Sequence, residues 1–325
     1  MAKQPTKHTH IVQKEYLKNF SFVENSKPFI WRFNKATGTI KKLPIKVVAV
    51  ENYFYPQMIE EWLANEIESK GIALIKRIID NQSIDFLNES EKEAVARWML
   101  VQDLRTREYR HELKFGFEAF TKLIVEKDFI PHQYPELKEK KFSMEIDEQV
   151  IKELQMGMMK RFEKLAPVIA KYHWCICINN TGKSYFTSDH PIVKDNSYIN
   201  SIKKLTGKKV LNQGLGYFSE GIEIQLPLSP ELCLILYDLK PLGKQLAVFD
   251  QYPQFKSLYP KHLVDLMTSP KKQAVEPNIV YFNEHITAFS NKYIFSKDND
   301  FSIAKNFLSR NLDFKKEDRI RLEIN

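Results

Sequence analysis

The stretch Tyr172–Lys194, Y-H-W-C-I-C-I-N-N-T-G-K-S-Y-F-T-S-D-H-P-I-V-K, carries a clear β pattern. Runs rich in β-branched and aromatic residues flank the turn-forming Asn-Asn-Thr-Gly at 179–182, which predicts two strands joined by a turn. The second strand runs into Ser188-Asp189-His190-Pro191, where the proline ends it. A carboxylate and an imidazole therefore mark a candidate site. Since adjacent strand residues point to opposite faces, we expect the side chains of Asp189 and His190 to diverge.

The first 56 residues are expected to form an arm and a β-hairpin. Phe29–Phe33 and Thr39–Leu43 have alternating patterns and flank the Gly-containing loop Asn34–Gly38, as hairpin strands do. A short helical turn is predicted within Ile11–Phe20, and an extended run within Lys46–Tyr55.

The middle of the chain, residues 57–171, is predicted to be helical. Apolar residues fall on one side of an amphipathic helix spanning Gln57–Asp80; they are Leu63, Ile67, Gly71, Leu74, Ile75 and Ile78. Glu68 lies on the flank of that side, from which it can reach inward.

A second helix is predicted from Glu91 to about Lys127. Ser90 with Glu93 resembles a capping box at its start. Apolar residues occupy most of its circumference, so we expect a central helix that is packed on several sides. A third long helix is predicted within Met144–Lys171.

The last part of the chain, residues 172–325, changes to short β-like runs, predicted at His173–Asn179, Lys183–Thr187, Gly221–Leu226 and Glu231–Leu236. The polar, Lys-rich segment 195–220 is predicted to be a long loop. Helices are predicted at Pro260–Val275, Asn283–Asn291 and Phe301–Arg310. The fold class is therefore α+β, with a helical middle region packed against a mainly antiparallel β region, and we expect one integrated domain.

Composition narrows the class of protein. The chain has 325 residues, of which 43% are hydrophobic, enough for a large core. The net charge of +8 favours nucleic acid or another anionic partner. We expect neither a signal peptide nor a membrane span, and the three cysteines fit a reducing cytoplasmic location. Nucleotide-binding and common hydrolase motifs do not occur.

Six short blocks follow one another in a recognisable order: H-I-V-Q-K-E-Y-L-K-N-F (10–20), V-A-V-E-N-Y-F-Y (48–55), L-R-T-R-E-Y-R (104–110), F-T-S-D-H-P-I-V (186–193), P-L-S-P (227–230) and N-E-H-I-T-A-F-S (283–290). Together they resemble an uncharacterised bacterial family numbered 4238 among the domains of unknown function. The family pattern has Pro where this chain has Gln13, and Asp-Asn-Pro or Asp-x-Pro where it has Asp189-His190-Pro191. A catalytic role for His190 would therefore be particular to this chain. The resemblance implies no activity.

Arg105 is the most informative single position. It falls in the same sector of the predicted central helix as Trp98 and Val101, where a guanidinium needs a carboxylate or phosphate partner. The best partners within the chain are Asp189, Glu68 and Glu51. Two interpretations stay open: a structural ion pair between helix and sheet, or a pocket arginine that meets an anionic ligand.

A basic stripe lies on roughly the opposite side of the same helix and consists of Arg107, Arg110, His111 and Lys114. It is either a track for a phosphate backbone or a solvated helix face. His173, Cys175 and Cys177 share one strand face and are either zinc ligands or buried small side chains.

His10 and Asp189, with Glu51 and His190 as additional candidates, could form a site for Mg²⁺ or Mn²⁺, or a metal-free acid–base pair. The alternative is that His10 and Asp189 cap turns and fix the N-terminal arm on the sheet. Our leading hypothesis is a nuclease-like phosphodiester hydrolase, with His10 as base or ligand, Asp189 as orienting carboxylate and Arg105 as phosphate stabiliser. The competing hypothesis is a non-catalytic protein that binds nucleic acid or a partner through its basic face.

Overall fold

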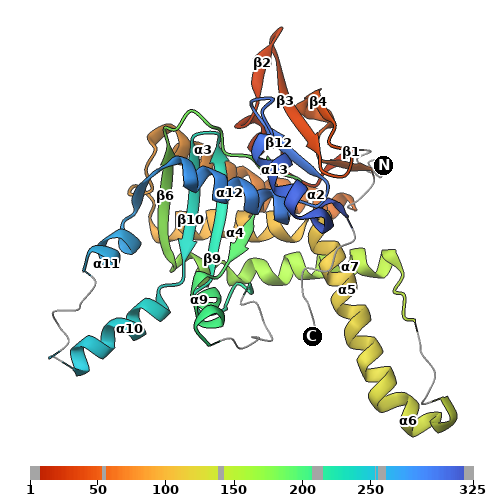
Figure 1. The fold of residues 1–325 in the computed structure, drawn as a ribbon. Coiled ribbons are helices and arrows are strands. Elements are labelled where there is room, and N and C mark those ends of the chain that lie inside the picture. Colours follow the sequence, from red (N-terminus) through yellow and green to blue (C-terminus); the bar gives the residue numbers. More distant parts are fainter. Residues whose placement is uncertain are drawn as a thin grey trace.

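The fold is α+β, with two five-stranded sheets and a long helical region (Figure 1). The computed structural model describes residues 8–52, 56–137, 143–206, 215–252, 254 and 261–317. The strands are β1 (His8–His10), β2 (Phe22–Glu24), β3 (Lys27–Asn34), β4 (Ile40–Pro44), β5 (Val50–Asn52), β6 (His173–Asn179), β7 (Thr187–Ser188), β8 (Val193–Asp195), β9 (Glu223–Ser229), β10 (Leu232–Tyr237), β11 (Lys271–Ala274) and β12 (Tyr293–Ser296).

The helices cover the sheets and extend beyond them. They are α1 (Lys14–Lys18), α2 (Gln57–Trp62), α3 (Ser69–Asn81), α4 (Glu89–Leu104), α5 (Arg107–Ile124), α6 (Ile130–Gln133), α7 (Glu148–Phe162), α8 (Ala166–Ala170), α9 (Ser197–Thr206), α10 (Lys240–Gln251), α11 (Lys261–Thr268), α12 (Glu276–Phe289) and α13 (Ser302–Arg310). In Figure 1, α5 and α6 project from the body on the side away from the N-terminal strands.

The first sheet has the order β11-β6-β10-β9-β8 and is antiparallel except for β11, which runs parallel to β6. The second has the order β2-β3-β12-β7, with β4 paired to β3. The predicted hairpin is confirmed, since β3 and β4 pair antiparallel with Ile30 opposite Leu43. A separate pair, β1 and β5, holds His10 opposite Val50. The predicted extended run ends in residues 53–55, which lie outside the described residues.

The stretch Tyr172–Lys194 contains two strands, as predicted, but the second is Thr187–Ser188 and not Lys183–Thr187, and the two do not pair with each other. Its first strand, β6, is bordered by β10 on one edge and by β11 on the other, so neither edge is open to β7. The chain crosses instead to the second sheet, where β7 pairs with β12. The stretch therefore links the two sheets.

Two helix predictions need correction. The second predicted helix is two helices, α4 and α5, because Thr106 leaves helical geometry and its hydroxyl accepts a hydrogen bond from the Tyr109 N–H. The capping box at the start of α4 uses Asn88 and Glu91, not Ser90 and Glu93. The first predicted helix is confirmed, since the π-helical segment Leu63–Glu68 joins α2 to α3 without a break and only widens the helix locally.

Two further corrections lie near the C-terminus. The predicted loop 195–220 contains α9, whose start is capped by the Asn196 side chain, which accepts from the Ile199 N–H. The predicted helix Pro260–Val275 is α11 followed by β11. Pro270 separates these elements, because a proline disfavours helical geometry at the residue before it.

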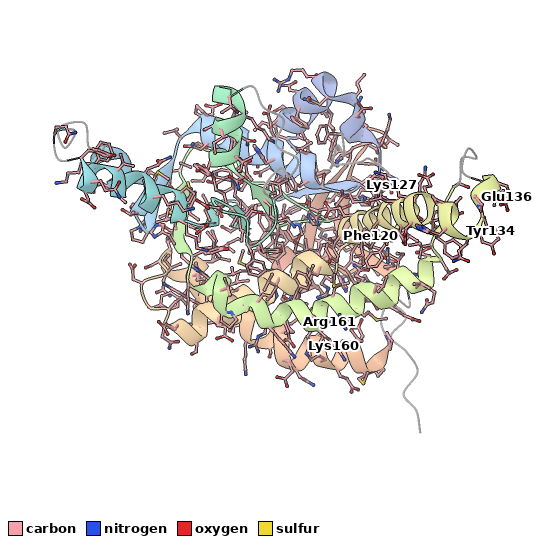
Figure 2. All side chains as sticks on the ribbon, turned by 90° about the horizontal axis from the view of Figure 1, so that it is seen from below. Phe120, Lys127, Tyr134, Glu136, Lys160 and Arg161 are labelled. Carbon is pink, nitrogen blue, oxygen red and sulfur yellow. The ribbon has the colours of Figure 1, made fainter. Side chains whose placement is uncertain are left out.

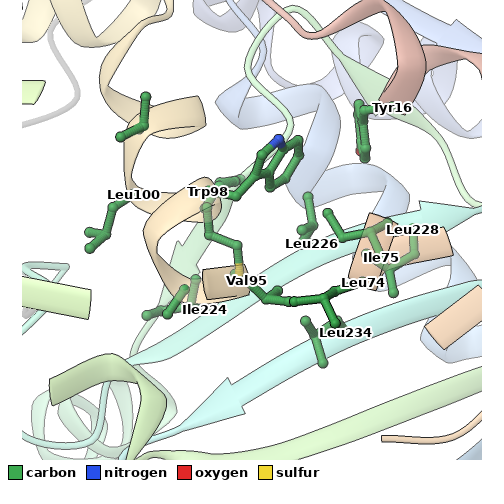
Figure 3. Packing of buried hydrophobic residues seen from close by; sticks show 14 of the residues in the cluster. Tyr16, Leu74, Ile75, Val95, Trp98, Leu100, Ile224, Leu226, Leu228 and Leu234 are labelled. Carbon is green, nitrogen blue, oxygen red and sulfur yellow. The ribbon is translucent and has the colours of Figure 1, made fainter. Parts of the chain in front are cut away.

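The main core lies where α3 and α4 cover the sheet (Figure 3). Trp98 and Val95 of α4 pack with Leu74 of α3 and with Leu226 of β9. Gly71 permits this approach, because a Cβ there would lie 2.4 Å from the Cβ of Trp98. The cluster includes residues from Val12 to Phe295, so the N-terminal arm is packed into the same core as the C-terminal strands.

Candidate functional site

Arg105 lies at the break between α4 and α5, and its side chain is only 4% exposed. The Nη1 atom donates to Glu68 Oε1, and the Nη2 atom donates to the backbone carbonyl of His10. Of the three predicted carboxylate partners, the structure therefore supplies Glu68, which ends the π-helical segment. Segments of this kind occur frequently at functional sites.

The N-terminal arm is fixed beside Arg105 by two glutamines. Gln102 accepts a hydrogen bond from the Gln13 N–H at 3.1 Å and donates to the Ile11 carbonyl at 3.0 Å. The Gln13 side chain accepts from the indole N–H of Trp98 at 2.7 Å. Gln13 thus anchors the arm to α4.

His10 is half-buried within this arrangement. Burial lowers its pKa below 6.5, and the nearby cations Arg105 and Lys14 lower it further, against a smaller opposing effect of Glu68. A ring nitrogen bonds to the Ile45 backbone, whereas Nε2 is buried without a hydrogen-bond partner among the described residues. The neutral ring at pH 7 then presents Nε2 as an acceptor.

Glu60 on α2 completes the cluster, and no sequence pattern had pointed to it. Burial raises its pKa above 4.5, although the Thr9 hydroxyl and Arg105 lower it in part. Glu60 Oε1 and Thr9 Oγ1 are buried and form no hydrogen bond of good geometry among the described residues, even though the two groups are close enough to interact. A carboxyl whose pKa is raised therefore lies in the same electrostatic cluster as an imidazole whose pKa is lowered.

Asp189 belongs to a different set of contacts. Its two carboxylate oxygens accept hydrogen bonds, each 2.8 Å long, from the backbone N–H groups of Asn291, Lys292 and Tyr293. Its side chain is 4% exposed. The carboxylate thus fixes the start of β12. This agrees with the alternative in which Asp189 caps a turn and takes no part in catalysis.

The predicted divergence of Asp189 and His190 is confirmed. His190 points toward α4, where its Nδ1 lies 2.7 Å from Thr106 Oγ1 and its Nε2 lies 3.2 Å from Asp103 Oδ1. Asp103 also accepts from Lys194 at 2.9 Å and from Tyr217 at 2.6 Å. Burial alone would raise the pKa of Asp103, but Lys194, His190 and the Tyr217 hydroxyl together hold it below its usual value.

The predicted basic stripe on α5 is largely neutralised by carboxylates. Glu51 accepts from Arg107 at 3.1 Å and from Arg110 at 3.0 Å, and Lys114 lies 3.7 Å from Glu118. Arg110 is only 6% exposed, so it does not belong to a solvated face. His111 Nδ1 lies 3.3 Å from the Asn291 side chain. Little of the stripe is left to face an anion.

The predicted ligands for Mg²⁺ or Mn²⁺, which are Glu51, His10 and Asp189, take part in three separate sets of contacts. Across the described part of the chain, no three His, Cys, Asp or Glu side chains gather closely enough to hold a metal ion. Cys175, Cys177 and Cys233 are buried free thiols, and burial raises the pKa of Cys175 to about 11. They behave as small apolar side chains.

These features define an α+β protein with a His–Arg–Glu cluster between its N-terminal arm and two of its helices. The chain belongs to the family described as Protein of unknown function (DUF4238), whose model matches residues 8–300, so the resemblance is confirmed. Comparisons with the curated proteins and with the solved structures returned no match. Within the described residues, the helices include none that is long and apolar enough to cross a membrane.

Proposed function

We propose that this chain is a nuclease-like hydrolase that cleaves phosphodiester bonds, with His10 and Glu60 as its acid–base pair. The observation that carries the proposal is the buried Nε2 of His10, which no described residue satisfies. A buried acceptor without a protein partner is costly, and a substrate hydroxyl or a water molecule would satisfy it.

The opposite pKa shifts of the two groups fit their roles. Burial disfavours the charged form of both groups, which lowers the pKa of His10 and raises that of Glu60. His10 is therefore suited to accept a proton, and Glu60 is better able to donate one. In the reaction, His10 takes the proton of the attacking hydroxyl as its oxygen bonds to phosphorus. Glu60 protonates the leaving oxygen as the second P–O bond breaks.

Arg105 contributes positive charge and position. Its guanidinium lies close enough to affect both His10 and Glu60, and its bonds to Glu68 and to the His10 backbone hold it in place. A fixed cation beside the reacting phosphate stabilises the charge that develops there. Glu68 orients the Arg105 guanidinium, and it replaces Asp189 as the orienting carboxylate of the site. The free thiols support a cytoplasmic location for this activity.

The test is cleavage of labelled RNA and DNA by the purified chain, with EDTA, Mg²⁺ or Mn²⁺. We expect His10→Gln to reduce the rate by about 100-fold or more, as loss of a general base does. The matched control is His173→Gln, because burial also lowers the pKa of the partly buried His173. The proposal fails if no substrate is cleaved under any of these conditions, or if both variants are as active as the parent chain.

A further inference from the structure

The net positive charge of the chain is concentrated in its N-terminal segment. Residues 1–50 contain ten of the 49 basic residues but two of the 41 acidic ones, a formal charge of +8, so the remainder of the chain sums to zero. Both of those acidic residues, Glu15 and Glu24, already form ion pairs with lysines of the same segment. An anionic partner would therefore be attracted to this segment and not to the α5 stripe.

A platform of three aromatic rings lies on one face of the N-terminal sheet. Phe22 lies opposite Phe29 in the β2–β3 register, and Trp31 follows two residues later on the same face. The Phe22 ring is nearly parallel to both others, with interplanar angles of 28° and 26° and centroid distances of 6.4 and 6.3 Å. All three side chains are partly exposed.

Lysines border this platform. Lys42 lies opposite Trp31 across β3 and β4, and its Nζ, which forms the ion pair with Glu24, lies 5.6 Å from the centroid of the Phe29 ring. Lys27 starts the same face of β3 and is exposed. Aromatic rings that stack on unpaired bases, together with cations that follow the phosphates, are what proteins use to bind single-stranded nucleic acid. In a duplex the bases are already stacked and paired, and the platform would gain nothing from them.

The platform is connected to the candidate site through the backbone. Strand β4 ends at Pro44, and the backbone of the next residue, Ile45, bonds to the His10 ring. We infer that the β2–β3–β4 face binds single-stranded nucleic acid and leads it toward His10. The inference rests on the proposed function for its substrate class, and it narrows that class to single strands.

The experiment measures binding of labelled 20-nucleotide single strands, RNA and DNA, and of the matching duplexes, in EDTA by fluorescence anisotropy. We expect single strands to bind at least 10-fold more tightly than duplexes. The variant Phe22→Ala/Phe29→Ala should weaken single-strand binding by about 10- to 100-fold. Lys27→Glu/Lys42→Glu, which leaves the rings in place, should weaken it and reduce its salt dependence.

The matched control is Phe120→Ala/Phe129→Ala. These rings are more exposed, at 61% and 50%, and lie on the projecting α5–α6 arm, where Figure 2 shows Phe120 with Lys127 and Tyr134. We expect this variant to bind like the parent chain. The inference is overturned if both aromatic variants lose binding equally, or if duplexes bind more tightly than single strands. It is also overturned if the chain binds only a polyglutamate peptide or anionic vesicles.

Cleavage is scored separately on gels, so the two proposals can fail independently. Platform-dependent binding without cleavage would contradict the hydrolase and support the platform. Cleavage that is unchanged in both platform variants would support the hydrolase and contradict the platform. Circular dichroism and thermal unfolding of each variant identify a loss of binding that is due to unfolding.

Discussion

Arg105 and His10, which are 95 positions apart in the chain, are joined by a hydrogen bond from the Arg105 guanidinium to the His10 backbone carbonyl. The same guanidinium binds Glu68 on the π-helical segment. One buried side chain therefore fixes the N-terminal strand, the α2–α3 helix and the break between α4 and α5 relative to one another. The candidate site depends on all three.

Replacement of Arg105 by Ala should destabilise the protein strongly. Removing one partner of a buried ion pair leaves the other uncompensated and typically costs about 3–5 kcal/mol in the free energy of unfolding. The control is Arg77→Ala, since the Arg77–Glu91 pair is half exposed and should be worth at most about 1 kcal/mol. Urea denaturation measures both variants. Equal losses would contradict the structural role of Arg105.

Replacement of Lys14 by Gln should raise the pKa of His10, because the Lys14 cation is one of the causes that lower it. In the folded state this pKa lies below 6.5. The stability that the neutral ring provides is therefore complete above pH 6.5 and is lost as the pH falls below that value. The acidic limb of any His10-dependent cleavage should move to higher pH in the variant. NMR titration of the His10 ring measures the shift, and Lys18→Gln on the same helix should produce none.

Replacement of Gly71 by Ala should separate α3 from α4. The new Cβ would overlap the Cβ of Trp98, so the helices must move apart, at a cost of about 1–3 kcal/mol. Gly157 lies within α7 and has no atom within 4 Å of an added Cβ. Gly157→Ala should instead stabilise the protein by roughly 0.5–1 kcal/mol through helix propensity. Thermal unfolding compares the two variants, and a shift in the same direction would contradict this packing.

Replacement of Asp189 by Asn should destabilise the protein, because the amide group offers one acceptor oxygen to a site built from three N–H donors. An amide nitrogen facing a backbone N–H leaves a buried donor unsatisfied, which costs about 1–3 kcal/mol. Hydrogen exchange should rise first at the amides of 291–293. If stability is unchanged while cleavage is abolished, Asp189 acts in the chemistry and not in the turn.

Part of the candidate site follows from the sequence. The helical sector of Arg105 predicts a buried guanidinium with a carboxylate partner, and the flank position of Glu68 makes it one of three candidates. Glu60 could not be recognised from the sequence, because a glutamate near the start of an amphipathic helix is usually exposed to solvent. Gln102 and Asp103 were not selected from the sequence, although two adjacent polar residues within an apolar helical stretch are a contrast that indicates a buried network.

The local pattern by itself determined the α+β class, the N-terminal hairpin, the strand His173–Asn179 and the amphipathic helix that begins at Gln57, because these depend on short-range periodicity and turn chemistry. Only the tertiary structure decided that Tyr172–Lys194 crosses between two sheets, since both edges of β6 were taken by strands distant in sequence. It also decided that Arg105 pairs with Glu68 and that His10 joins them. Partner choice is set by packing among distant segments, which no local pattern encodes.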